Sequence, residues 1–177
     1  MSSKIIKRLT QKEDHTLDSM IRDCYPKIYG YVYRRVMDEA LAKDLTQETF
    51  YHFFEHLHQY QDQGKLLNYL YRIAQHLLYD YFKSKKAVPS ELDESLISDP
   101  AYDTQAILKR QEEGIILRKW IEQLPLHLQD IVYLRYYEKM KFKDISKITG
   151  IHISTLKSQA KLAVELLEKM AKKEGWK

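Results

Sequence analysis

The sequence predicts an all-α fold in two helical domains, and three observations lead to that expectation. Apolar residues recur every three or four positions through most of the chain, which is the period of amphipathic helices. The chain has only five glycines and four prolines in 177 residues, whereas turn-rich sheet folds need more of both. A segment near the middle lacks the helical period. We therefore expect domains at residues 1–86 and 106–177, joined by a linker at 87–105.

The first domain is expected to contain three helical stretches. Residues 17–35 have helical spacing around Pro26, which fits one kinked helix or two helices. Residues 39–60 are predicted to form one helix, and residues 66–82 another. The apolar face of the middle helix is expected to consist of Phe50, Phe53, Phe54 and Leu57.

The predicted linker is acidic. Residues 87–103 contain five aspartates and glutamates, two prolines, and neither lysine nor arginine. This composition is typical of a flexible spacer.

The second domain ends in a helix-turn-helix pattern. Helices are expected at 108–124 and 128–137, then a short one at 143–149, a sharp turn at Gly150, and a long helix from Ser154 with Leu156 facing inward. This pattern is typical of DNA-binding proteins, although an ordinary helical hairpin also fits it. The polar groups available for phosphates and base edges are His152, Ser154, Thr155, Lys157, Ser158, Gln159 and Lys161.

Composition sets broader limits. A net charge of +4 and a pI near 8.9 are compatible with a polyanionic partner. The single cysteine, Cys24, excludes an intrachain disulfide and any multi-cysteine metal site, and we expect it to be a small buried side chain. There is no export-signal pattern and no apolar run near 18 residues, so we expect a cytoplasmic chain without membrane insertion.

Three motifs, in order, resemble the extracytoplasmic-function (ECF) sigma factors of the sigma-70 family. Residues 44–50, DLTQETF, resemble the signature of sigma region two. Residues 69–74, YLYRIA, with Asp80 and Tyr81 after them, are similar to the segment that follows. Residues 124–137 and the helix-turn-helix behind them resemble region four. The order of the three motifs is more specific than any one of them.

This resemblance implies an alternative-sigma transcription initiation factor with core RNA polymerase and promoter DNA as partners. It implies no catalysis, no metal and no cofactor, and it implies an anti-sigma protein that holds the factor inactive. The acidic linker is similar to the connector that lies in the polymerase cleft in place of nucleic acid.

The resemblance also implies binding surfaces. An exposed stripe on the middle helix would dock on the clamp coiled coil of the polymerase, although a solvated helix face also fits the spacing; its residues are Asp44, Gln47, Glu48 and Tyr51. Aromatic and basic groups would open and hold the minus-ten strand: Tyr60, Asn68, Tyr69, Arg72, His76, Lys83, Lys85 and Lys86. Tyr71 also offers a stacking surface, but some of these tyrosines are expected in the core.

The chain departs from the family pattern at several positions. His76 stands where asparagine is common, and Tyr69 where tryptophan is common. In the recognition helix, Gln159, Leu162 and Val164 occupy positions that usually carry arginine, which predicts weaker phosphate contacts. The helix-turn-helix residues named above are expected to read the minus-thirty-five element.

Two alternatives remain at the level of sequence. One is a stand-alone helix-turn-helix regulator whose N-terminal domain senses a ligand or dimerises. The other is a zinc peptidase, because His52, Glu55 and His56 fit the HxxEH pattern. No distal ligand is recognisable, the chain is short for that class, and the docking motif already accounts for this helix.

Overall fold

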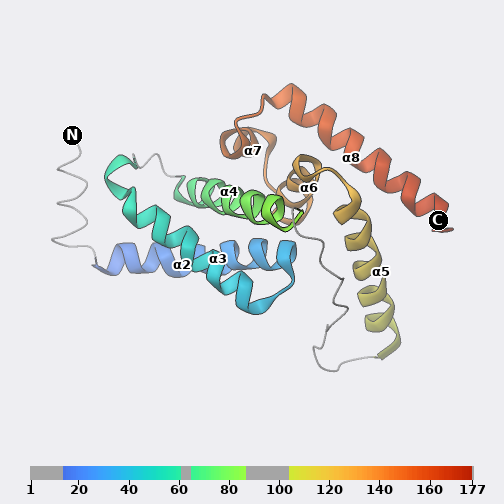
Figure 1. Cartoon of the computed structure of the whole chain (residues 1–177), viewed down its shortest axis with the longest axis horizontal. Coiled ribbons are helices and arrows are strands. Elements are labelled where there is room, and N and C mark those ends of the chain that lie inside the picture. The colour runs from blue at the N-terminus through green and yellow to red at the C-terminus, as the bar shows by residue number, and fades with distance from the viewer. Residues whose placement is uncertain (1–13, 61–64, 87–103, 177) are drawn as a thin grey trace. The chain divides into compact units, whose positions relative to one another are not determined.

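The computed structural model describes residues 14–60, 65–86 and 104–176, and every regular element within them is helical, which confirms the all-α expectation (Figure 1). The residues fall into two compact units, with a boundary after Lys86. Most of the predicted acidic linker, residues 87–103, lies outside the described residues. In the described part of the chain, no helix is long and apolar enough to span a membrane.

The N-terminal unit is a bundle of α2 (Asp14–Val36), α3 (Glu39–Glu55) and α4 (Leu66–Lys86), each of which packs on the other two. Pro26 lies inside α2, so residues 17–35 belong to one helix. All three helices bury one side, because apolar residues recur at helical spacing. The largest fully buried side chains of this core are Ile28, Tyr31, Phe53, Leu70, Tyr71 and Leu78.

A tight connection sets where α3 begins. Met37 has φ 53°, and its N–H donates to the carbonyl of Tyr33 at 2.8 Å. The Asp38 carboxylate then accepts from the N–H of Leu41 at 3.0 Å and caps α3. An aspartate at this position satisfies an N–H group that the helix itself leaves without a partner.

Two expectations for α3 and one for α4 are wrong in detail. The predicted helix 39–60 ends at Glu55, and a short 3₁₀ helix, η1 (Leu57–Gln59), follows it. Phe54 is 42% exposed and does not join Phe50 and Phe53 in the core. Tyr71 is 1% exposed and packs edge-on against Tyr31 with ring centroids 5.2 Å apart, so it offers no stacking surface.

The C-terminal unit contains α5 (Thr104–Gln123), α6 (Leu126–Val132), α7 (Phe142–Thr149) and α8 (Ile153–Lys173). A π-helical turn, η2 (Tyr133–Tyr137), continues α6. Helix α6 packs on α5 and α8, and α5 also packs on α8. The buried side chains of this unit include Ile121, Leu128, Ile131, Leu134, Ile145 and Leu156.

The helix-turn-helix has the predicted geometry. Gly150 ends α7 with φ 72°, a conformation that glycine adopts without steric cost. The Ser146 hydroxyl donates to the carbonyl of Ile151 at 2.6 Å and ties the turn to α7. Leu156 is fully buried, as its position in the pattern predicts, so the opposite side of α8 is the exposed one.

Candidate functional site

The acidic stripe of α3 is exposed along its whole length. Asp44, Gln47, Glu48 and Tyr51 are all exposed, and Tyr51 is 61% exposed. On the other side of α3, the hydroxyls of Thr46 and Thr49 donate to the carbonyls of Ala42 and Leu45. Because both buried hydroxyls donate a hydrogen bond within the helix, neither is buried without a hydrogen-bond partner. The stripe therefore lies on a well-packed helix.

The stripe continues into a small polar cluster at the end of α3. The Tyr51 hydroxyl donates to the Glu55 carboxylate, and this bond raises the pKa of Tyr51 above its ordinary value. The imidazole of His52 lies between two carboxylates, with Nε2 3.7 Å from Glu48 Oε1 and Nδ1 3.6 Å from Glu55 Oε2. The predicted docking residues Glu48 and Tyr51 are thus connected through Glu55 and His52.

Helix α4 carries the predicted minus-ten residues on its exposed face. Arg72, His76 and Lys83 are exposed, and together with Asn68 they lie on the side of α4 opposite buried Leu70 and Ala74. Lys85 is exposed near the end of the helix, with its ammonium 5.8 Å from the ring centroid of Tyr81. The side chain of Lys86 lies outside what the structure describes.

Sequence reasoning overlooked Tyr79 on the same face. Tyr79 is 49% exposed and falls between His76 and Lys83 in a spacing of four, three and four residues from Arg72. An aromatic ring among cations is the combination that binds single-stranded nucleic acid. The spacing itself was a usable signal once the buried side of α4 was known.

Two predicted minus-ten tyrosines form an aromatic group with Phe53. The rings of Tyr60 and Tyr69 are 5.2 Å apart, and each is edge-on to Phe53, at 5.6 and 6.1 Å. Both tyrosines are half-buried, whereas Phe53 is 2% exposed. Part of each ring therefore packs on the core, and part faces outward beside the exposed side of α4.

The first turns of α8 present the predicted recognition groups. Ser154, Lys157 and Lys161 lie in one exposed row, and Thr155 and Ser158 lie in the next. Gln159 is only half-exposed because it lies closer to buried Leu156 and Ala160. The Lys161 ammonium is 3.7 Å from Glu165, an exposed pair of small energetic effect. Lys157 lies one turn nearer the start of α8 than this pair and is exposed.

His152 has a structural role at the start of α8. Its Nδ1 accepts from the N–H of Ser154 at 3.4 Å and lies 2.8 Å from the Ser154 hydroxyl. Histidine thus caps the helix in place of the usual serine, threonine or aspartate. The prediction that His152 belongs to the turn and the prediction that it binds DNA are compatible, because it is exposed beside the recognition residues.

Comparison with protein families assigns both units. Residues 20–88 match the family model of sigma-70 region 2, and residues 115–167 match that of sigma-70 region 4. Together the matches cover more than two thirds of the chain. The chain belongs to the sigma-70 family. Within the family it is of the ECF type, as the motifs predicted.

Curated relatives of this sigma factor match along most of their length. It is 26% identical to the ECF RNA polymerase sigma factor SigM of Bacillus subtilis over 81% of this chain and 87% of that one. It is 25% identical to the RNA polymerase sigma factor YlaC of Bacillus subtilis over 91% and 95%. It is 23% identical to the RNA polymerase sigma-H factor of Pseudomonas aeruginosa over 94% and 91%.

Solved structures share the fold. CnrH, in complex with the cytosolic domain of CnrY, has a TM-score of 0.72 at 11% identity, over 99% of this chain and all of that one. The sigma factor RpoE in complex with NepR, from Bartonella quintana, has a TM-score of 0.67 at 18% identity, over 88% and 96%.

The sigma factor is accordingly an alternative-sigma transcription initiation factor, which binds core RNA polymerase and directs it to specific promoters. Helices α2, α3 and α4 match the region 2 model. This match disfavours a stand-alone helix-turn-helix regulator, because such a regulator does not require a sigma region 2 domain. The same match includes His52, Glu55 and His56 in a sigma domain and disfavours the zinc peptidase.

Proposed function

We propose that this initiation factor works through three separate helix faces. The α3 stripe of Asp44, Gln47, Glu48 and Tyr51 docks on core polymerase. The exposed face of α4, with Tyr60 and Tyr69 beside it, binds the opened minus-ten strand. The first turns of α8 read the minus-thirty-five element. One observation carries this proposal: most of the residues that the sequence assigns to each surface are exposed, on or next to a helix whose opposite side is buried.

The chemistry of each face fits its partner. The α3 stripe is acidic, and acidic rows steer association with basic surfaces and set the register of docking. Exposed ion pairs contribute only about 0.2–1 kcal/mol each. Most of the docking affinity must therefore come from several contacts acting together, and exposed Tyr51 supplies the largest apolar area among them.

The α4 face meets the demands of strand opening. Extruding a base from the duplex costs a few kcal/mol. Stacking on aromatic side chains returns about 1–3 kcal/mol per base, and cations neutralise the phosphates. Among the residues of α4, Asp80 is the single acid, against one arginine and three lysines. The binding energy of the assembly, without a covalent step in this chain, then melts the DNA.

The proposed function also implies where the factor acts and which partners it has. It acts in the cytoplasm, where polymerase and promoter are, and it needs no cofactor. An anti-sigma protein is a further proposed partner, and two of the structures with the same fold support it, since each is a complex with another protein, in one case the anti-sigma factor NepR.

The experiment separates docking from promoter reading. Asp44→Lys should weaken binding to core polymerase by about tenfold or more, because a like charge at a docking surface costs several kcal/mol. Glu168→Lys, which makes the same charge change on an exposed part of α8, should leave core binding intact. Core affinity is measured by fluorescence anisotropy, and promoter-dependent output by run-off transcription. If the unsubstituted chain shows no stable core binding, the proposal fails and the stand-alone regulator is favoured.

A further inference from the structure

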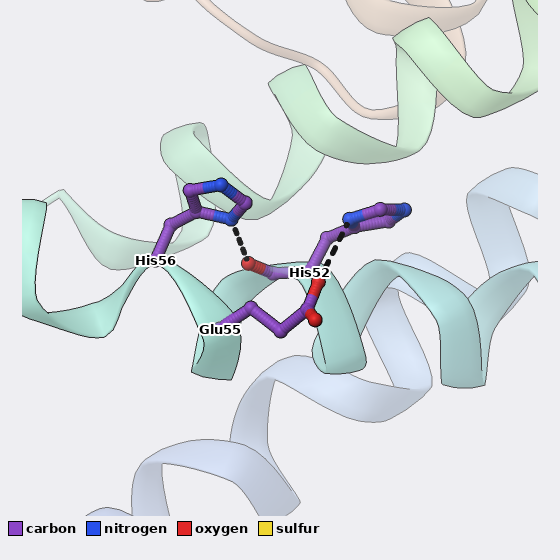
Figure 2. A group of neighbouring side chains, drawn as sticks. All are labelled: His52, Glu55 and His56. Carbon is purple, nitrogen blue, oxygen red and sulfur yellow. Dashed lines mark hydrogen bonds and ion pairs between the residues drawn. The ribbon is translucent and has the colours of Figure 1, made fainter.

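The end of α3 carries a side-chain group that the initiation function does not use. His52, Glu55 and His56 each place a ligand-type atom so that the three atoms lie within 4.8 Å of one another. In the described part of the chain, this is the one group of three or more such residues with that geometry. Figure 2 shows the Glu55 carboxylate directed along α3 toward His52, with the His56 ring at the end of the helix.

We propose that His52, Glu55 and His56 form a surface site for a divalent transition-metal ion. His52 and Glu55 lie one turn apart on α3, and His56, the residue that follows the helix, still donates its N–H to the carbonyl of His52 at 3.2 Å, so the three side chains start from the same turn. Zinc takes imidazole nitrogen and carboxylate oxygen at about 2.0–2.2 Å, which puts neighbouring ligand atoms roughly 3.4 Å apart. His52 Nδ1 and Glu55 Oε2 are already 3.6 Å apart.

The contacts around the two imidazoles indicate which nitrogen of each ring would bind the metal. His56 Nδ1 is 3.0 Å from the carbonyl of His52, so this nitrogen carries the proton and the lone pair is on Nε2. On His52, Nε2 faces Glu48 when Nδ1 faces Glu55. A histidine that ligates through one nitrogen commonly directs the other to a carboxylate or a carbonyl, which fixes the tautomer. Both histidines have such a partner here.

The ligand set determines the class of ion. Two imidazoles and one carboxylate suit zinc, copper, nickel or cobalt, whereas magnesium and calcium prefer oxygen ligands alone. Three protein ligands leave one tetrahedral position for water or for a group from a partner. All three side chains are partly or fully exposed, so ring rotation can close the remaining separation without disturbing the core.

The site can tune docking, a consequence that rests on the proposed function. Glu48 faces His52, and Tyr51 donates to Glu55, so a bound ion would touch the partners of two docking residues. It would also add two positive charges beside an acidic stripe. Attraction between the stripe and a basic surface would then weaken.

Zinc titration of the full chain, followed by calorimetry, tests the site itself. We expect one zinc per chain, and at least a tenfold loss of affinity in His56→Ala and in Glu55→Gln, since loss of an outer-shell partner alone costs about 10- to 100-fold. His127→Ala removes an exposed histidine elsewhere, Cys24→Ser removes the thiol, and neither should change binding. Far-UV circular dichroism checks that each variant is folded. Absence of saturable binding, or equal affinity in both ligand variants and the unsubstituted chain, would overturn the site.

A second measurement tests the coupling and keeps it apart from the function. Core polymerase affinity is compared in zinc-saturated and chelator-treated buffer. Zinc should weaken binding of the unsubstituted chain several-fold and leave His56→Ala unchanged. An equal effect on both would overturn the coupling. Lack of core binding without zinc would instead defeat the docking proposal, while the titration would still decide the metal site.

Discussion

The exposed faces of α4 and α8 both carry cations, but the kind of side chain that lies between those cations differs. On α4, Arg72 and Lys83 are separated by His76 and Tyr79, whose rings are exposed. On α8, Lys157 and Lys161 are surrounded by the hydroxyls of Ser154, Thr155 and Ser158. Rings stack on unpaired bases, whereas hydroxyls bond to phosphates and base edges of a duplex. Two helices with similar charge are thereby suited to different forms of DNA.

The largest expected effect concerns the buried side on which the α8 face depends. Leu156→Ala should destabilise the C-terminal unit by about 2–5 kcal/mol, because Leu156 is fully buried and its loss leaves a cavity. Leu162→Ala on the same helix is the matched control, since Leu162 is 46% exposed, and it should change stability by less than about 0.5 kcal/mol. Urea unfolding measures both. Equal costs for the two leucines would contradict the assignment of the buried side.

The second prediction tests the aromatic character of α4. Tyr79→Ala should lower the affinity of the polymerase–sigma complex for a single-stranded minus-ten oligonucleotide by about 1–3 kcal/mol, the value of one base stack. Tyr79→Phe keeps the ring and should keep the affinity. Fluorescence anisotropy with labelled oligonucleotide measures the change. If Tyr79→Ala instead weakened binding to duplex DNA alone, the proposal that the α4 face binds single strands and the α8 face binds duplex DNA would be contradicted.

The third prediction concerns the phosphate contacts of α8. Lys157→Ala should reduce the salt dependence of duplex minus-thirty-five binding, with the log–log slope smaller by about 0.9, because one phosphate contact is removed. It should also lower promoter-dependent transcription while leaving core binding intact. Lys172→Ala, in the last turn of α8, is the control and should leave the slope unchanged. Equal loss of core binding and transcription would contradict the proposed separation of surfaces.

The smallest effect is expected at the cap of α8. His152→Ala should cost about 0.5 kcal/mol in unfolding free energy, at the low end for a cap, because the bond to the N–H of Ser154 is long. His152→Asn should restore or improve stability, since asparagine is a preferred cap residue. Thermal unfolding of both variants measures the difference in stability. A drop in DNA binding for His152→Asn with normal stability would assign His152 to recognition as well.

Much of the architecture could be predicted from the helical periodicity of apolar residues and from the residues at which helices begin or end. Gly150 and buried Leu156 were enough to locate the helix-turn-helix, because a left-handed turn favours glycine and the first inward position of the second helix must be apolar. The exposed stripe on α3 followed equally from its spacing. The assignments of individual residues to polymerase, to minus-ten or to minus-thirty-five DNA stay predictions.

Periodicity could not decide which side of an aromatic helix is covered. Tyr71 and Tyr79 are both tyrosines of α4, yet one is buried against Tyr31 and the other is exposed, because α2 and α3 pack on only one side of α4. Phe54 is exposed next to buried Phe53, since consecutive residues of a helix project in different directions and only one side of α3 is buried.

The sequence by itself determined the helical class, the two regions and the sigma-70 family, because these depend on the order and spacing of residues along the chain. The tertiary structure decided which rings face solvent, where α3 ends, and how His52, Glu55 and His56 come within 4.8 Å of one another. Helical spacing specifies a shared side, but only packing against neighbouring helices and the bonds of each side chain fix what that side presents.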